Sequence, residues 1–206
     1  MKKLLIPLFS LFLLSSPSVF ADDISDFQIE GISIGDSLLD YMTEDEILKE
    51  IERTKDWYAY LEANKYADIS FNKDFRTYES MQFFIKNNST NQYITDKNEK
   101  YTILYIRGII NFIEDFDGCI AKRNEIVKVL LNMFPNAQKD ESVFEYGSDP
   151  SGDSIVDTVV FAFDSGTEID AYCVDMEETF RIKKNWSEGL RVSISSKETT
   201  NWLKNY

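Results

Sequence analysis

The residues that could carry chemistry in this chain are limited by one absence, because the sequence contains no histidine. Histidine supplies the general base in Ser-His-Asp and Cys-His catalysis, and it is the commonest ligand in metal sites. Those reactions and the usual zinc and copper centres are therefore excluded. What remains for catalysis is a serine without a histidine base, or a pair of carboxylates.

The candidate serine is Ser37, in the block Gly35-Asp36-Ser37-Leu38 that follows a short apolar segment. This block resembles the signature of GDSL-type esterases and lipases, which implies a nucleophilic serine activated by the histidine of a C-terminal Asp-x-x-His block. No such block exists here, so the hydroxyl of Ser37 remains a weak nucleophile near neutral pH. The chain also lacks the alternating strand and helix pattern of that family's parallel sheet. We therefore interpret the block as a glycine turn followed by a helix N-cap at Asp36 or Ser37.

Carboxylates are the second candidate. Two carboxyl groups facing one cleft can run hydrolysis without histidine, as in glycosidases, but acidic residues are so frequent here that the sequence selects no pair. Asp149, Asp153 and Asp157 surround Gly152 and form a weak calcium candidate. Their spacing does not match an EF-hand loop, and turn-forming chemistry explains them equally well. We expect no catalytic residue, no cofactor and no other metal site.

The two cysteines, Cys119 and Cys173, are both placed to point inward. Cys119 lies seven residues before Ile126 on a predicted helical face, while Cys173 alternates with Ile169 and Ala171 on one face of a predicted strand. An even number of cysteines in an oxidising compartment predicts a Cys119–Cys173 disulfide. Two separate buried thiols are the alternative, and no Cys-x-x-Cys motif indicates redox activity.

The first 21 residues have the pattern of a secretory signal peptide. Lys2 and Lys3 precede an apolar run over 4–14, and small residues lead to the expected cleavage after Ala21. The run is too short to cross a bilayer, which needs roughly 20 apolar residues. We predict that residues 22–206 form a single exported domain without a membrane span, in the periplasm or outside the cell.

The charge balance excludes several partner classes. The chain has 22 basic and 36 acidic residues and a formal charge of −14. Loss of Lys2 and Lys3 with the leader leaves 20 basic against 36 acidic residues, a charge of −16. Such a surface repels nucleic acid and anionic lipid and favours cationic partners or divalent ions, although solubility explains it more simply. A hydrophobic content of 43% is enough to bury a core, which excludes global disorder.

Hydrophobic periodicity predicts an α+β fold, with about six to seven antiparallel strands and helices packed on one face of the sheet. A capping box from Thr43 to Glu46 opens a helix that we expect to extend to Leu61. The clearest helix ends at Pro135, and Ser196 caps a short last helix. The expected strands are 66–71, 78–86, 101–112, 143–146, 155–163, 168–174 and 190–195, after a short strand within 27–34.

Aromatic side chains are numerous on these predicted strands. Packing in the core or between strands is the main interpretation, and a platform that binds carbohydrate or peptide is the alternative. The set is Phe83, Phe84, Tyr101, Tyr105, Phe161, Phe163 and Tyr172.

The N-terminal block of the mature chain is similar to the start of a group of uncharacterised small exported proteins of marine bacteria. The similar segments are Phe27 to Met42, Glu44 to Ile47, the helix around Cys119, Val156 to Phe161, Tyr172-Cys173 and Leu190 to Ser195. Together they span most of the mature chain. The resemblance implies no known activity, and its two cysteines at corresponding places agree with the expected disulfide.

Together, these patterns favour a non-enzymatic binding or interaction module of the cell envelope. One hypothesis is a factor with a stable envelope protein as partner. A second is an acidic inhibitor or sequestering protein, whose capture of a cationic ligand or divalent ion weakens with salt. A third is a carboxylate-based hydrolase, which requires two acids facing one pocket.

Overall fold

The computed structural model describes residues 24, 27–58, 61, 65–87, 96 and 99–205 of the chain. The predicted signal peptide at 1–21, with its cleavage after Ala21, lies outside these ranges. Within them the chain forms four α-helices and one seven-stranded sheet, which confirms the predicted α+β class.

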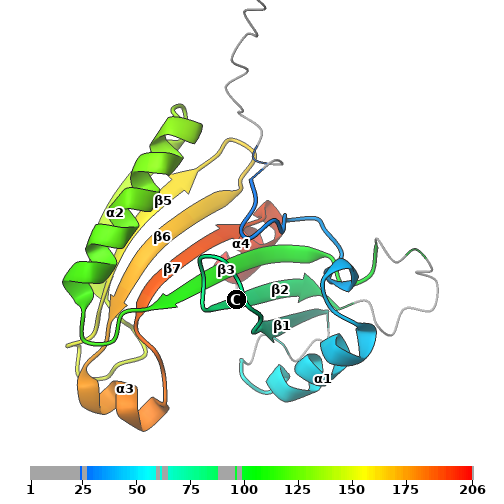
Figure 1. Cartoon of the computed structure of the whole chain (residues 1–206), viewed down its shortest axis with the longest axis horizontal. Helices are drawn as coiled ribbons and strands as arrows, with labels where there is room; N and C mark the ends of the chain where they lie inside the picture. The colour runs from blue at the N-terminus through cyan, green and yellow to red at the C-terminus, as the bar shows by residue number, and fades with distance from the viewer. Residues whose placement is uncertain are drawn as a thin grey trace, which may run out of the picture.

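The sheet is antiparallel throughout, with the strand order β1-β2-β3-β7-β6-β5-β4 (Figure 1). The last strand of the chain, β7, lies between β3 and β6 and joins the first three strands to the later meander. The strands are β1 (Tyr66–Phe71), β2 (Ser80–Lys86), β3 (Ile103–Asn111), β4 (Gln138–Glu145), β5 (Ile155–Ala162), β6 (Glu168–Asp175) and β7 (Gly189–Ser195).

The helices begin at local capping signals. Ser37 caps the short 3-10 helix η2 (Leu38–Asp40), and Thr43 and Glu46 form the predicted capping box of α1 (Glu44–Thr54). Asp115 caps α2 (Phe116–Met133) by accepting a hydrogen bond from the backbone N–H of Gly118. The remaining helices are α3 (Glu178–Lys184) and α4 (Lys197–Lys204).

Two N-terminal predictions are wrong in detail. The α1 helix ends at Thr54 instead of Leu61, because the buried Thr54 hydroxyl donates a hydrogen bond of 2.6 Å to the Asp68 carbonyl and ties the chain to β1. The predicted strand within 27–34 is reduced to one bridge between Ile29 and Ile32. Positive φ angles at the two residues between them turn the chain back on itself.

One face of the sheet carries the main hydrophobic core. The pairing register places one buried apolar side chain from each of six strands in a single cross-strand row: Ile69, Phe83, Ile106, Ile194, Ile169 and Phe161. Helix α2 packs on this face against β6 and β7. The structure pairs Cys119 of α2 with Cys173 of β6, with their Cα atoms 6.0 Å apart, as the sequence predicted.

The second face is covered in part by α4. Trp202 packs its ring on Tyr66 of β1 and Phe84 of β2, with ring centroids 4.8 and 5.3 Å apart. The Thr199 hydroxyl donates a hydrogen bond to the Leu104 carbonyl and holds the helix on β3. Helices therefore lie on both faces, with α2 on one and α4 on the other, so the prediction that the helices pack on one face is wrong. Among the described residues, no helix is long and apolar enough to cross a membrane.

Candidate functional site

The second face of the sheet contains a pocket of about 600 Å³, and residues of α4 form one of its sides. A cavity of this size suits a small polar or aromatic ligand. Its lining combines tyrosine rings, carboxyl groups and a guanidinium group. The lining residues are Tyr58, Asp68, Gln82, Phe84, Tyr105, Arg107, Tyr146, Glu168, Asp170, Tyr172, Ser195, Thr199, Thr200 and Leu203.

The strand register brings these side chains together. Alternate residues of a strand point to the same face, and directly paired residues of neighbouring strands form rows across it. One row on the second face runs from Gln82 through Arg107 and Ser193 to Asp170. The neighbouring row runs over five strands, through Asp68, Phe84, Tyr105, Ser195 and Glu168. The site is therefore built on the strands themselves, which position side chains more rigidly than loops do.

Arg107 lies at the centre of this surface. Its Nε donates a hydrogen bond of 2.5 Å to the hydroxyl of Tyr105, and its Nη1 donates one of 3.1 Å to Oε1 of Gln82. The guanidinium also lies over two aromatic rings, with Cζ 5.1 Å from the centroid of Tyr105 and 5.8 Å from that of Tyr172. These contacts hold the guanidinium group in one orientation on the pocket side of the sheet.

The donors of Arg107 are only partly used. Within the described part of the chain, Nη2 donates no hydrogen bond, and no carboxylate oxygen lies within ion-pair distance of the guanidinium. An arginine that is withdrawn from bulk water is usually paired with a carboxylate. Arg107 is therefore prepared to bind an acceptor that the protein itself does not supply.

Asp68 is held by its neighbour Gln82. The amide Nε2 of Gln82 donates to both carboxylate oxygens of Asp68, at 2.8 and 2.7 Å. Burial raises the pKa of Asp68, while the bond from Gln82 and the charge of Arg107 act in the opposite direction. Gln82 thus links Asp68 to Arg107 and separates the two charges.

The carboxyl group of Asp170 has fewer hydrogen bonds than that of Asp68. It accepts one hydrogen bond of 3.3 Å, from the hydroxyl of Ser193. Burial, and then the negative charge of Glu168, raises the pKa of Asp170 to about 6, against the opposing effects of Ser193 and Arg107. A carboxyl group with a strongly shifted pKa that lines a cleft marks a candidate functional site.

The remaining polar groups of the pocket are neutral donors and acceptors. Burial raises the pKa of Tyr105, Tyr58 and Tyr146 above the ordinary value of tyrosine, so their hydroxyl groups stay protonated at neutral pH. On α4, the Thr200 hydroxyl is buried and has no hydrogen-bond partner among the residues that the structure describes.

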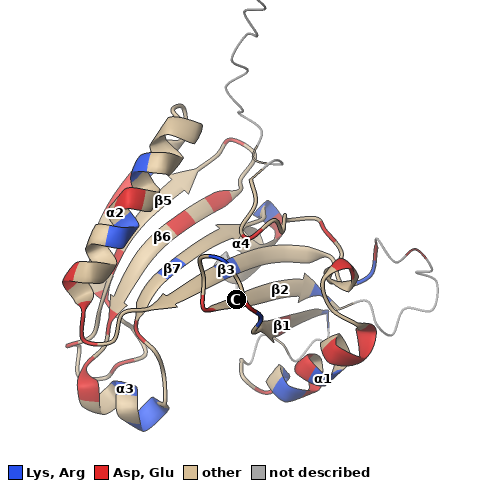
Figure 2. Cartoon of the chain, viewed as in Figure 1, with Lys and Arg blue, Asp and Glu red and all other residues tan. Residues whose placement is uncertain are grey.

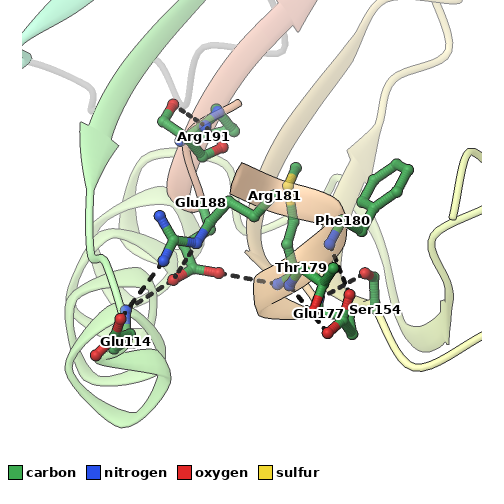
Figure 3. Close-up of polar contacts among 10 residues, drawn as sticks. Glu114, Ser154, Glu177, Thr179, Phe180, Arg181, Glu188 and Arg191 are labelled. Atoms are coloured by element: carbon green, nitrogen blue, oxygen red, sulfur yellow. Dashed lines mark hydrogen bonds and ion pairs between the residues drawn. The ribbon is translucent and has the colours of Figure 1, made fainter. Parts of the chain in front are cut away.

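A second buried charged cluster, at the start of β7, has an internal explanation (Figure 3). Glu188 accepts hydrogen bonds from the backbone N–H groups of Glu114 and Met176, and Arg181 of α3 lies 3.5 Å from the same carboxylate. Nearby, Arg191 donates to the carbonyl groups of Ser187 and Leu190. These charges are used to fasten α3 and the β7 entry to the sheet.

The residues singled out in the sequence do not form this site. The Ser37 hydroxyl is buried and donates a hydrogen bond of 2.7 Å to the Lys100 carbonyl, while it accepts one from the backbone N–H of Leu39. It acts as a helix cap, in agreement with our interpretation of the Gly35-Asp36-Ser37-Leu38 block.

The calcium candidate Asp149, Asp153 and Asp157 is not gathered into one site. Hydrogen bonds from the side chains of Ser154 and Ser151 lower the pKa of Asp149 to about 2 and occupy its carboxylate. Asp157 instead forms an ion pair with Arg123 of α2, and Asp153 is exposed. The described residues hold no group of three acidic, cysteine or histidine side chains that could bind a metal ion.

The aromatic set divides between two roles. Phe83, Tyr101 and Phe161 are fully buried in the core, as the packing interpretation predicted. Tyr105 and Tyr172 instead line the pocket, where they flank Arg107. Sequence reasoning did not assign a role to Asp68, Gln82 or Asp170.

The surface charge of the helices is mixed. Figure 2 shows basic and acidic residues close together along α1, α2 and α3, and Arg53–Glu50 and Lys122–Glu125 are ion pairs one turn apart. The acidic residues of the chain are therefore not spread evenly over these helices.

No protein family, curated protein or solved structure matches this chain. The pocket is therefore the feature from which we infer a function.

Proposed function

We propose that this protein is an exported, non-catalytic binding module whose second-face pocket holds a small polar ligand. The observation that carries the proposal is Arg107, whose guanidinium is oriented by Tyr105 and Gln82 while Nη2 has no partner among the described residues. A charged donor in such a place gains most from a bound acceptor, because charge-assisted hydrogen bonds are stronger than neutral ones.

Export is supported by the N-terminal pattern and by the cysteines. Residues 1–21 have the charge and hydropathy of a signal peptide. The pairing of Cys119 with Cys173 fits an oxidising compartment. In the periplasm or outside the cell, a sheet that is tied to α2 by a disulfide and carries a polar pocket on its other face suits the capture of a metabolite.

The test is to identify what the pocket retains. The full chain is expressed with its leader, mixed with the small-molecule fraction of an extract of its native cells, gel-filtered and denatured, and the released compounds are identified by mass spectrometry. Wild-type protein should retain one compound or one class of compounds. Arg107→Met should retain at least roughly tenfold less of this compound, because a hydrogen bond to a charged group is lost.

The matched control is Arg76→Met, which removes an exposed arginine outside the pocket and should bind as the wild type does. Far-UV circular dichroism checks that each variant is folded. If the wild type retains nothing, or if Arg107→Met retains as much as the wild type, the proposal is wrong.

A carboxylate-based hydrolase is the second candidate, and one observation favours it: Asp68 and Asp170 line the same pocket. Asp170, with its pKa raised to about 6, has the property of a general acid. Asp68 fits the role of nucleophile or base less well, because both of its oxygens accept hydrogen bonds from Gln82. We therefore rank this function below binding.

Hydrolysis is tested with a panel of nitrophenyl glycosides and esters. Turnover that disappears in Asp170→Asn but persists in Asp164→Asn, which alters an exposed hairpin aspartate, would establish the hydrolase. Equal background rates in all three proteins would leave binding as the function.

A further inference from the structure

Apart from Asp68, whose carboxylate accepts hydrogen bonds from Gln82 on the β1 side, the charged groups of the pocket lie at two poles. Arg107 on β3 and Asp170 on β6 are both paired with Ser193 on the strand between them. Two strand spacings separate their Cα atoms by roughly 10 Å. Glu168 lies two residues before Asp170 on β6, so its side chain points to the same face. The pocket therefore has a basic side on β3 and an acidic side on β6.

The basic side is shaped for a carboxylate. The hydroxyl of Tyr105 accepts the single N–H of Nε, and Gln82 accepts one of the two N–H groups of Nη1. The second N–H of Nη1 and both N–H groups of Nη2 have no partner within the described residues, and they form the planar fork that binds a carboxylate through both oxygens. Asp68 does not occupy this fork, because Gln82 holds it at a distance.

The acidic side is shaped for an ammonium group. Asp170 supplies negative charge, and the pocket also presents the rings of Tyr146 and Tyr172. A cation over a tyrosine face is attracted by the ring, and a carboxylate beside it adds a charge-assisted hydrogen bond.

A ligand with a single charge would meet an unfavourable pole. A simple anion on Arg107 would lie near the carboxyl group of Asp170, and a simple cation beside Asp170 would lie near the guanidinium. A ligand with both charges meets an opposite charge at each end. Arg107 and Asp170 form no ion pair with each other, so the two charges of such a ligand would give each of them a partner of opposite charge.

We infer that the pocket binds a zwitterion of amino-acid or dipeptide size, with its carboxylate on Arg107 and its ammonium group beside Asp170. The inference rests on the proposed function and names the ligand class of the same site. The cavity of about 600 Å³ has room for such a molecule.

The test uses calorimetric titration of the full, leader-cleaved protein with each of the protein amino acids and a set of dipeptides. The best-binding compound is then compared with its N-acetyl derivative, which lacks the ammonium group, and with its carboxamide, which lacks the carboxylate. Each derivative should bind about tenfold more weakly or worse, because it loses one charge-assisted contact. This comparison needs no variant and does not depend on mutant folding.

Two variants then assign each charge to its pole. Arg107→Lys keeps a positive charge but loses the fork, so it should bind the parent compound more weakly and discriminate less against the carboxamide. Asp170→Asn should lose the discrimination against the N-acetyl derivative. Asp164→Asn should behave as the wild type in both comparisons.

The outcomes separate this inference from the function on which it rests. If no amino acid or dipeptide binds while the wild type still retains a metabolite from the extract, the zwitterion is wrong and the pocket stands. Equal affinity for the parent compound and both derivatives also overturns the inference. If no small molecule is retained at all, both proposals are wrong.

Discussion

At the scale of single residues, Asp170 shows that the second face of the sheet carries charge at the expense of stability. Burial and the neighbouring Glu168 raise the pKa of Asp170 to about 6, from an ordinary value of 3.8. The folded protein therefore holds the proton of Asp170 more tightly than the unfolded chain does. Polar groups that reduce stability in this way are concentrated at functional sites.

The pKa shift of Asp170 predicts a pH dependence. Because the folded pKa lies above the unfolded one, the contribution of Asp170 to the free energy of unfolding is greatest below about pH 4 and falls as the pH rises to about 6. Asp170→Asn removes this loss and should stabilise the protein by roughly 3 kcal/mol at pH 7, with little change at pH 4. Urea unfolding at the two pH values measures it.

The control for this prediction is Asp164→Asn, which changes an exposed aspartate of the same hairpin and should leave the free energy of unfolding unchanged. A stability of Asp170→Asn at pH 7 that equals or falls below the wild-type value would show that the carboxyl group is not held in an unfavourable environment.

The charged residues of the pocket were not predicted, for a physical reason. Charged residues at alternate strand positions, such as Asp68, Arg107 and Asp170, have the pattern of a sheet face exposed to water. The same pattern arises when a helix covers that face and leaves a pocket beneath it. Helix α4 comes last in the chain, and nothing in its sequence states on which face it lies. The cysteines were predictable because both lie on apolar faces that must meet in the core.

At the scale of secondary-structure elements, α4 is the wall that makes the second face a pocket. Trp202 fastens it to the sheet through Tyr66 and Phe84, and Thr199, Thr200 and Leu203 of α4 line the cavity. Loss of the tryptophan contact should therefore loosen the helix and open the pocket.

Trp202→Ala should lower the free energy of unfolding by about 2 kcal/mol, less than for a fully buried tryptophan because Trp202 is partly exposed. It should also weaken ligand retention, although Trp202 itself is not a lining residue. Trp57→Ala is the matched control, since Trp57 is 47% exposed and lies outside the pocket. Unchanged retention by folded Trp202→Ala would show that α4 does not maintain the site.

Most strands were predictable because their alternation follows burial. Residues 66–71 were predicted with the bounds of β1, and Ser196 caps α4 as expected. Strand β4 was predicted only in its second half, because all eight of its residues are exposed at the sheet edge and show no apolar alternation. Helix α3 was missed because its N-cap is Glu177, a residue type that rarely signals a helix start, whose carboxylate accepts from the N–H groups of Thr179 and Phe180.

At the scale of the whole molecule, the disulfide and the pocket lie on opposite faces of one sheet. Cys119 and Cys173 join α2 to β6 on the core face, across a sequence separation of 54 residues. The bridge stabilises the fold by restricting the unfolded chain, and both cysteine side chains are buried in the core on the face opposite the pocket. Stability and ligand binding should therefore separate.

The double variant Cys119→Ser/Cys173→Ser should lose about 4 kcal/mol in the free energy of unfolding, according to the loop-entropy relation. The fraction that remains folded should retain the ligand with unchanged affinity. Urea unfolding and the metabolite-retention assay measure the two quantities on the same samples. A weaker affinity of the folded fraction would mean that the bridge also shapes the second face.

The measurement that tests the central claim most directly is an amide chemical-shift map of the isotope-labelled mature protein, recorded before and after addition of the small-molecule fraction from its native cells. Binding in the pocket predicts shifts concentrated at Arg107, Ser193 and Asp170 and along α4, with α2 unaffected. Shifts confined to the α2 face, or no shifts while the protein remains folded, would contradict a ligand site on the second face of the sheet.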